Sequence, residues 1–476
     1  MKLFLLLNIT AHASETQALS YEEVLETALA RNPALVGARL DVEAADGALM
    51  AAKGVFDPTL NAGSTANQFT SESTREFGEV LTEFKSLDWR AGVDQILPTG
   101  TTLGLDWSTT RTRFKYELRD TGLVVESEEP LFESRMVARL TQSILEGHRM
   151  ASNLEGVRQA ARARDTADAN RRAMRQQTLA DAASAYWNTR TQRRLAAIAQ
   201  QAVETAKEEQ RVVHAKVEQG TLAPVERARV DAAVVQAQRE QLTAEDIARN
   251  TEDNLLLLIG ESPGTAITLT TEPAEPRTID IDMAAVEASA LENNAELLAS
   301  RVREESTEMA RTDAKHRRLP QLDLNASYAL IGYEPTTEAA TEELFGGDLP
   351  EWSLGGSLSM PLLGRADRGQ YLQRTAEAAK ARAERMNLER QIRSSIRMQV
   401  RAVEAAAVQV SLALANLTFA EQTLAAERAL RVAGRVIQKD LLESMAAVDD
   451  ALTQVEQARG DYQLALIELE RLKGTL

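Results

Sequence analysis

Two long stretches without proline constrain the fold of this chain more than any other feature. The first runs from His148 to Gln219 and the second from Ala366 to Ile437, and both are rich in Ala, Arg, Gln and Glu. These residues favour the α-helix. Read as single helices, the two stretches would each extend about 108 Å at about 1.5 Å per residue. No ordinary globular core is that long, so we expect an elongated assembly of helices.

The composition supports helices that pack through small side chains. Aromatic residues make up only 4% of the chain, which disfavours a few large compact cores. The chain contains no cysteine, which excludes disulfides and thiolate metal sites. Its formal charge of −17 argues against nucleic acid as a partner, because phosphate binding needs basic surfaces. Since no unbroken apolar run reaches the length of a membrane span, we expect no transmembrane helix.

The N-terminus points to export across the inner membrane. Lys2 precedes the apolar run Leu3–Leu7, and Ala11-His12-Ala13 has the small-x-small form of a signal peptidase site. We therefore expect residues 1–13 to be a signal peptide. The alternative is a frayed apolar terminus.

An internal repeat organises the rest of the chain. A shift of 262 positions superimposes several residues without a gap: Asn32 on Asn294, Leu35 on Leu297, Arg39 on Arg301, Lys53 on Lys315, and Pro58 on Pro320. A duplication is the most economical account. We predict a first repeat over 14–262, a proline-containing linker over 263–279 and a second repeat over 280–476. Each repeat would contain an incoming helix, extended segments, a long helix and a returning helix.

After each matched proline the hydrophobic period changes from helical to two. In Gln321–Leu330 and Trp352–Met360, apolar and polar residues alternate. Such alternation suits a strand of a membrane β-barrel or a half-buried strand of a soluble sheet. Three of the four tryptophans lie in the extended segments, as an interfacial girdle requires, which favours the membrane. They are Trp89, Trp107 and Trp352.

The first repeat has more extended segments than the second, and they are Thr59–Gln68, Trp89–Leu97, Thr101–Thr110 and Arg135–Leu145. A tight turn at 98–100 joins the middle pair, and we expect long polar loops over 70–85, 112–133 and 331–350. Short turns at one end and long loops at the other are typical of outer-membrane barrels. One chain offers too few strands to close a barrel, so several copies must contribute.

The order of these elements resembles the outer membrane efflux proteins of the TolC type. The resemblance rests on Leu319-Pro-Gln-Leu-Asp-Leu-Asn-Ala-Ser-Tyr328 and on the C-terminal stretch, with Asp440-Leu-Leu-Glu443 and Gly474-Thr-Leu476. It implies a homotrimer with a β-barrel in outer-membrane lipid and an α-helical tunnel in the periplasm. It also implies docking to a periplasmic adaptor and an inner-membrane transporter. The familiar arrangement has four strands per protomer, whereas this chain has segments for four or six.

The resemblance also directs attention to the ends of the long helices. Asp440 and Glu443 share a helical face. Alone they would be interpreted as a solvated helix start, but the family pattern predicts that they line the narrowest aperture. Arg431 and Val436 stand where some members have a tyrosine and an arginine that help to lock the tip, so other bonds must hold it shut here. The expected adaptor-docking tips comprise Gly220, Leu222, Ala223, Pro224, Gly434 and Leu441.

These features predict a passive outer-membrane export duct rather than an enzyme. No catalytic, cofactor-binding or metal-binding motif stands out, so we expect no cofactor and no metal. One alternative is a periplasmic adaptor, although adaptors have one helical hairpin and this chain has two. The other is a soluble structural coiled coil, which the amphipathic strands disfavour. Tyr186-Trp187, in the middle of the first long helix, we interpret as packed between neighbouring helices.

Overall fold

The computed structural model describes residues 17–75, 78–118, 121–126, 129–145, 150–273, 275–276, 282–347, 349–432 and 438–476. The predicted signal peptide, 1–13, lies outside these residues. The chain divides into two compact units. Unit 1 comprises Met1–Val42, Thr166–Arg301 and Ala383–Leu476, and unit 2 comprises Glu43–Asp165 and Val302–Arg382. Both units take residues from both predicted repeats, so the spatial division cuts across the sequence repeat.

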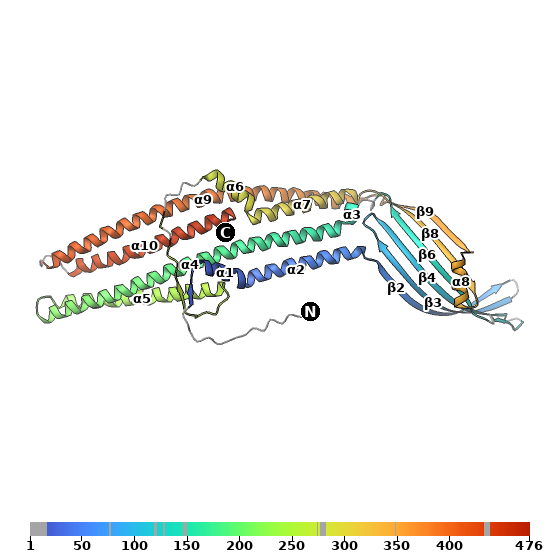
Figure 1. Ribbon diagram of the computed structural model, residues 1–476, viewed down its shortest axis with the longest axis horizontal. Helices are drawn as coiled ribbons and strands as arrows, with labels where there is room; N and C mark the ends of the chain where they lie inside the picture. Colours follow the sequence, from blue (N-terminus) through green and yellow to red (C-terminus); the bar gives the residue numbers. More distant parts are fainter. Residues whose placement is uncertain are drawn as a thin grey trace. The chain divides into compact units, whose positions relative to one another are not determined.

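The long helices are present as predicted. Helix α4 runs over Glu155–Glu218, after the short α3 at Met150–Asn153, and α5 returns over Val225–Leu258. Helix α9 runs over Arg365–Val432 and α10 returns over Gln438–Lys473. Each pair forms a helical hairpin (Figure 1).

The two incoming helices break at equivalent positions. The first consists of α1 (Tyr21–Arg31) and α2 (Pro33–Lys53), and the second of α6 (Met283–Asn293) and α7 (Ala295–His316). Proline at the first position of α2 starts a new helix without losing a backbone bond. Asn32 and Asn294 occupy the two breaks, and each accepts a hydrogen bond from a backbone N–H of the following helix.

A second pair of bonds matches across the chain. Arg39 donates to the carbonyl oxygen of Leu29 at 3.2 Å, and Arg301 donates to that of Leu291 at 3.1 Å. In each case a guanidinium bridges the break by reaching the last turn of the preceding helix. Such bonds satisfy carbonyl groups that a helix end would otherwise leave without a partner.

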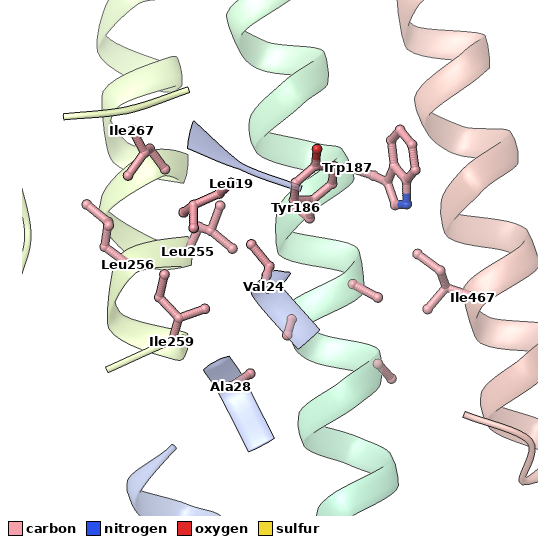
Figure 2. Close-up of a cluster of buried hydrophobic side chains, with 13 residues drawn as sticks. Leu19, Val24, Ala28, Tyr186, Trp187, Leu255, Leu256, Ile259, Ile267 and Ile467 are labelled. Carbon is pink, nitrogen blue, oxygen red and sulfur yellow. The ribbon is translucent and has the colours of Figure 1, made fainter. Parts of the chain in front are cut away.

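Unit 1 has a core around the middle of α4 (Figure 2). Tyr186 is fully buried and Trp187 nearly so, among Leu19, Val24, Leu255, Ile259 and Ile467. The Tyr186 hydroxyl accepts a hydrogen bond from the backbone N–H of Thr271 at 2.9 Å. Beside it, β1 (Gln17–Leu19) pairs in parallel with β7 (Ile267–Leu269). The prediction that the Tyr-Trp pair packs between helices is confirmed.

Unit 2 contains a sheet of antiparallel strands in the order β2-β3-β4-β6-β8-β9, with β5 paired to β4 (Figure 1). The bounds are Thr59–Arg75 for β2, Gly78–Ile96 for β3, Thr101–Leu118 for β4, Leu123–Glu126 for β5, Leu131–Ser143 for β6, Gln321–Glu334 for β8 and Pro350–Ser359 for β9. The predicted turn at 98–100 joins β3 to β4, with Gly100 at a φ of 77°. All six predicted extended segments are therefore strands.

The sheet has one apolar and one polar face where all six strands overlap. One row of paired residues on the apolar face contains Leu60, Val93, Leu105, Ala138, Tyr328 and Trp352. A neighbouring row on the polar face contains Thr59, Asp94, Arg139, Ser327 and Ser353. We call these the apolar face and the polar face. Trp89 and Trp107 lie on the apolar face with Trp352, because they alternate in step with Val93 and Leu105.

The loop predictions need correction. The predicted loops over 70–85 and 112–133 consist largely of strand, because β2, β3 and β4 continue past the apolar band. Beyond the band, the apolar side chains lie on the opposite face of these strands. The alternation expected of a membrane strand therefore stops before the strands themselves end.

The predicted loop over 331–350 contains a helix, α8 (Thr337–Gly346), which Thr336 caps at its start. It packs on the apolar face of β8 at Gly332, where a Cβ atom would meet the carbonyl oxygen of Ala340 at 2.1 Å. Thr109 and Ser134 extend the same row, are fully buried and share a hydrogen bond of 2.9 Å. Three small residues thus make room for α8.

One helix of the described residues, Arg365–Arg431, is long and apolar enough to cross a membrane by length and composition alone. The sequence criterion of an unbroken apolar run does not identify it, because polar residues such as Gln409 and Asn416 interrupt the run. Val408, Leu412 and Phe419 on this helix are exposed.

Candidate functional site

The first hairpin turns at residues with little side-chain bulk. Gly220 ends α4 with a φ of 73°, and the N–H of Thr221 donates to the carbonyl oxygen of Lys216 at 2.9 Å. A positive φ is readily adopted by glycine alone. Ala223 and Pro224 are exposed and Leu222 is half-buried, so this predicted tip is accessible along its length.

The tip of the second hairpin is only partly described. Gly434 and Val436 lie outside the described residues, and α10 begins at Gln438. Leu441, which we predicted as part of the adaptor-docking tip, is 1% exposed in a single copy. Its place in the first turns of α10 directs it into the helix packing of unit 1.

The two predicted aperture acids are exposed on the first turns of α10. Asp440 lies in the first turn, where the helix dipole favours an acid. Glu443 pairs with Lys439 of the preceding turn, with 3.2 Å between the Nζ and Oε1 atoms. Neither acid has a partner on another helix within the described residues. Asp440 therefore presents the less compensated charge.

A buried polar cluster, not anticipated from the sequence, joins three helices close to these acids. Glu209 of α4 accepts a hydrogen bond at 2.8 Å from Nη1 of Arg431 in α9 and another at 2.8 Å from Gln438 in α10. The second guanidinium nitrogen, Nη2, lies 2.6 Å from Oε1. We call Glu209, Arg431 and Gln438 the tip cluster.

Burial makes the tip cluster strong. The side chains of Arg431 and Glu209 are 20% and 11% exposed, so water screens their attraction poorly. Nη1 of Arg431 donates the hydrogen bond to Glu209, and Nη2 adds a short ion-pair contact. The cluster therefore holds the second hairpin to α4 on either side of its turn. Arg431 stands where some family members have a tyrosine, and here it forms the ion pair with Glu209.

A second group of acids lies between α5 and α10. Asp449 is half-buried, and burial raises its pKa to about 6, with further contributions from the negative charges of Asp450 and Glu240. A carboxyl group with this pKa changes charge close to physiological pH.

The polar face of the sheet carries its own ion pairs. Arg139 contacts Asp106 at 2.5 Å and Asp94 at 3.7 Å, and Arg135 contacts Glu351 at 2.6 Å. These residues come from four different strands. A face so rich in charge needs water, so it suits the inside of an aqueous channel and not contact with lipid.

Metal binding finds no support in the arrangement of acids and histidines. Across the part of the chain that the structure describes, no three side chains of His, Asp or Glu come together as a metal site would need.

Comparison with known structures identifies the fold. The Campylobacter jejuni CmeC outer membrane channel is similar, with a TM-score of 0.70 and 15% identity over 96% of this chain and 85% of that one. The outer membrane protein VceC from Vibrio cholerae matches with a TM-score of 0.67 and 15% identity, over 95% and 96% of the two chains. A membrane protein from Pseudomonas aeruginosa matches with a TM-score of 0.68 and 17% identity, over 95% and 93%.

Comparison of sequences identifies the family. No curated protein matches the sequence. The family model described as "Outer membrane efflux protein" matches residues 104–261 and 287–475, which is well over half of the chain. The chain belongs to the outer membrane efflux protein family.

Proposed function

We propose that the protein is the outer-membrane channel of a tripartite efflux or secretion system. Three copies would form a passive duct, which a periplasmic adaptor and an inner-membrane transporter open at its helical tip. The observation that carries the proposal is the pairing of two elements in one chain. One is a sheet with opposite apolar and polar faces, and the other is a pair of helical hairpins much longer than a globular core.

The sheet supports a barrel shared between copies. Its apolar face extends from Leu322 to Leu330 along β8, which is about 26 Å at about 3.3 Å per residue and about 20 Å of height at a tilt of about 40°, close to the apolar band of about 25 Å in a barrel. In lipid the free edges of β2 and β9 must be paired. Because β9 runs opposite to β2, the β9 edge of one copy can pair with the β2 edge of the next. Six strands from each of three copies would close a barrel of eighteen.

The helices support a tunnel of the same three copies in the periplasm. Val408, Leu412 and Phe419 of α9 are exposed, as are Val235 and Leu242 of α5. Apolar stripes on rods of this length need partner helices. Neighbouring copies would cover them, which accounts for a helix apolar enough to pass a membrane-span criterion without crossing a membrane.

The hairpin tips would form the periplasmic entrance. Asp440 and Glu443 of three copies would line its narrowest part, and the tip cluster would hold each second hairpin in the closed position. An adaptor would bind the turn at Gly220, Leu222, Ala223 and Pro224, together with Gly434 of the second hairpin. The energy for export would come from the transporter, so the chain itself needs no catalytic site and no cofactor.

The matched bonds of Arg39 and Arg301 support the duplication of 14–262 and 280–476. Both repeats keep the same helix break and the same guanidinium bridge. A duplicated chain gives three copies a pseudo-sixfold ring of hairpins, which helps to close a tunnel.

The proposal is tested by separating membranes from cells that make the protein. We expect an outer-membrane trimer, and deletion of the chain should sensitise cells to the exported compounds even when adaptor and transporter remain. Recovery from the soluble periplasm would favour the adaptor alternative. Recovery as a soluble filament would favour the structural coiled coil.

A further inference from the structure

Strands β2, β3 and β4 continue farthest beyond the apolar band, whereas β6 and β8 end there after a few more residues. Beyond Leu330 and Pro350, which pair with each other, β9 contributes no further residue. In contrast, β2, β3 and β4 run on together to Arg75, Gly78 and Leu118, and β5 joins β4 there. We call this part the projecting ribbon. It lies at the end of the strands opposite the turn at 98–100.

The two faces exchange their character in the projecting ribbon. Within the band, one side of β4 carries Leu103, Leu105 and Trp107, and the other side carries Asp106, Ser108 and Thr110. Farther out, the first side continues as Arg111, Arg113 and Lys115, and the second as Phe114, Tyr116 and Leu118. The pairing of β3 with β4 has no break, so the faces themselves do not cross over. The side chains therefore change from apolar to charged on one side and from polar to apolar on the other, while the strand pairing continues.

The aromatic side forms a continuous surface across four strands. The rings of Phe69 and Phe84 stack with centroids 4.8 Å apart, and those of Phe114 and Tyr116 lie 5.2 Å apart. Phe84 pairs with Phe114 in the register, which joins the two pairs. We call the surface formed by Phe69, Phe84, Phe114, Tyr116, Leu123 and Val125 the outer aromatic face.

The outer aromatic face is open to water in a single copy. Phe69 is 52% exposed, Leu123 57% and Val125 48%. The opposite side is charged, and Lys85 there pairs with Glu83 at 2.8 Å. An apolar surface of this extent marks a contact that a single copy leaves unfilled. Because the outer aromatic face continues the polar face, the barrel proposed above would turn it inward, over the pore.

The dimensions permit the ribbons of three copies to meet. From Thr110 to Leu118 the ribbon reaches about 26 Å at about 3.3 Å per residue. A barrel of about eighteen strands, spaced about 4.8 Å apart and tilted by about 40°, has a radius of about 18 Å. The ribbon is therefore long enough to bend to the axis. The outer aromatic face carries no charge, so three copies can approach there despite a net charge of −17 on each.

We propose that the outer aromatic faces of three copies pack together over the external mouth and close it, as a second gate in addition to the periplasmic tip. The inference rests on the proposed trimeric barrel. The charged side of each projecting ribbon would remain in water outside the cell, and the aromatic side would be buried among the three copies. Outward flow of cargo would separate the ribbons, and the aromatic contacts would close them again.

The test uses the absence of cysteine from the chain. Ser353→Cys places one thiol on the polar face, inside the proposed pore. Intact cells are treated with a small membrane-impermeant maleimide or with a bulky polyethylene-glycol maleimide. The parent with this thiol should react with the small reagent and only slowly with the bulky one. Replacing Phe69, Phe84 and Phe114 by serine should accelerate the bulky reaction about tenfold, because the mouth loses its aromatic contacts.

The matched control shifts each substitution to the neighbouring residue on the charged side. Gln68→Ser, Lys85→Ser and Arg113→Ser should leave the bulky reaction at the parent rate. A direct readout avoids any loss of folding. As the only cysteine in the chain, Phe69→Cys should form disulfide-linked dimers between copies on oxidation, and Gln68→Cys should form few.

The outcomes separate this inference from the proposed function. If the bulky reagent reacts at the same rate in all variants, and Phe69→Cys forms no more dimers than Gln68→Cys, the ribbons do not close the mouth. That result would instead indicate an open mouth, where the outer aromatic face contacts apolar cargo. Failure of the small reagent to reach Ser353→Cys in any variant, or absence of the trimer from the outer membrane, would instead overturn the barrel.

Discussion

The guanidinium of Arg431 contacts both carboxylate oxygens of Glu209, a residue 222 positions earlier in the chain. Gln438, just past the turn of the second hairpin, binds the same carboxylate. Three helices therefore depend on one acid at the end of unit 1. If the tip must move for export, this contact resists the movement.

Glu209→Ala should loosen the tip. It leaves the guanidinium of Arg431 buried without its partner, which costs about 3 kcal/mol. We expect lower thermal stability and a larger resting conductance in planar bilayers. Glu208→Ala is the control, since Glu208 is 60% exposed and its pair with Arg211 contributes little. A double variant, Glu209→Leu with Arg431→Met, should recover stability while the conductance stays high. Equal conductance in all of these variants would show that the cluster does not restrain the tip.

Sequence reasoning found the helices and missed this cluster for a physical reason. The absence of proline over tens of residues is a local signal, and it predicted both long helices, although α4 starts at Glu155 rather than at His148. The partners of Glu209 are separated from it by more than 200 positions and lie among many similar charges, so no spacing distinguishes them. The partners of Glu209 can be recognised only from the packing of the three helices.

The strands show the same limit in another form. Alternation located all six, but it stopped near Thr110, where the apolar side chains change from one face of β4 to the other. A pattern read for a single environment ends when the environment changes, even though the strand continues. The helix α8 was missed because the cap at Thr336 and the space left by Gly332 can be recognised only when the sheet has folded and α8 packs on it.

Asp449 should make stability depend on pH. The pKa of Asp449 in the folded protein, about 6, lies above the ordinary value of an aspartate. Between these two pH values, the folded protein holds a proton on Asp449 that the unfolded protein has lost. Stability should therefore rise as the pH falls from 7 towards 5. Solvent screening reduces the effect to about 1 kcal/mol. Asp449→Asn should be more stable than the parent at pH 7 and should lose this part of the dependence.

Thermal unfolding of the purified protein at several pH values measures the effect. Asp461→Asn, an exposed position on the same helix, controls for a general loss of negative charge. If the parent and Asp449→Asn show parallel curves from pH 5 to 7, Asp449 does not take up its proton in this range.

The exposed turn at 220–224 should bind the adaptor. Leu222→Asp and Ala223→Asp place a charge where we expect partner helices to pack, at a cost of about 2 kcal/mol or more for a charge buried at an interface. We expect loss of export and loss of adaptor co-purification, with normal amounts of trimer. Gln238→Asp, exposed on α5 away from the turn, should behave as the parent. Normal export in the Leu222 and Ala223 variants would place the docking surface elsewhere.

The acids at the start of α10 should select cations at the periplasmic entrance. In a trimer, Asp440 and Glu443 bring six carboxylates to one narrow opening. Lys439 partly compensates Glu443, so Asp440→Ala should reduce cation selectivity more than Glu443→Ala does. Charges elsewhere should contribute little, because salt screens them beyond about 8 Å. Reversal potentials in a salt gradient measure the selectivity, and multivalent cations added on the periplasmic side should block the parent more than the double variant. Unchanged selectivity and block in the double variant would leave both acids as solvated residues of a helix start.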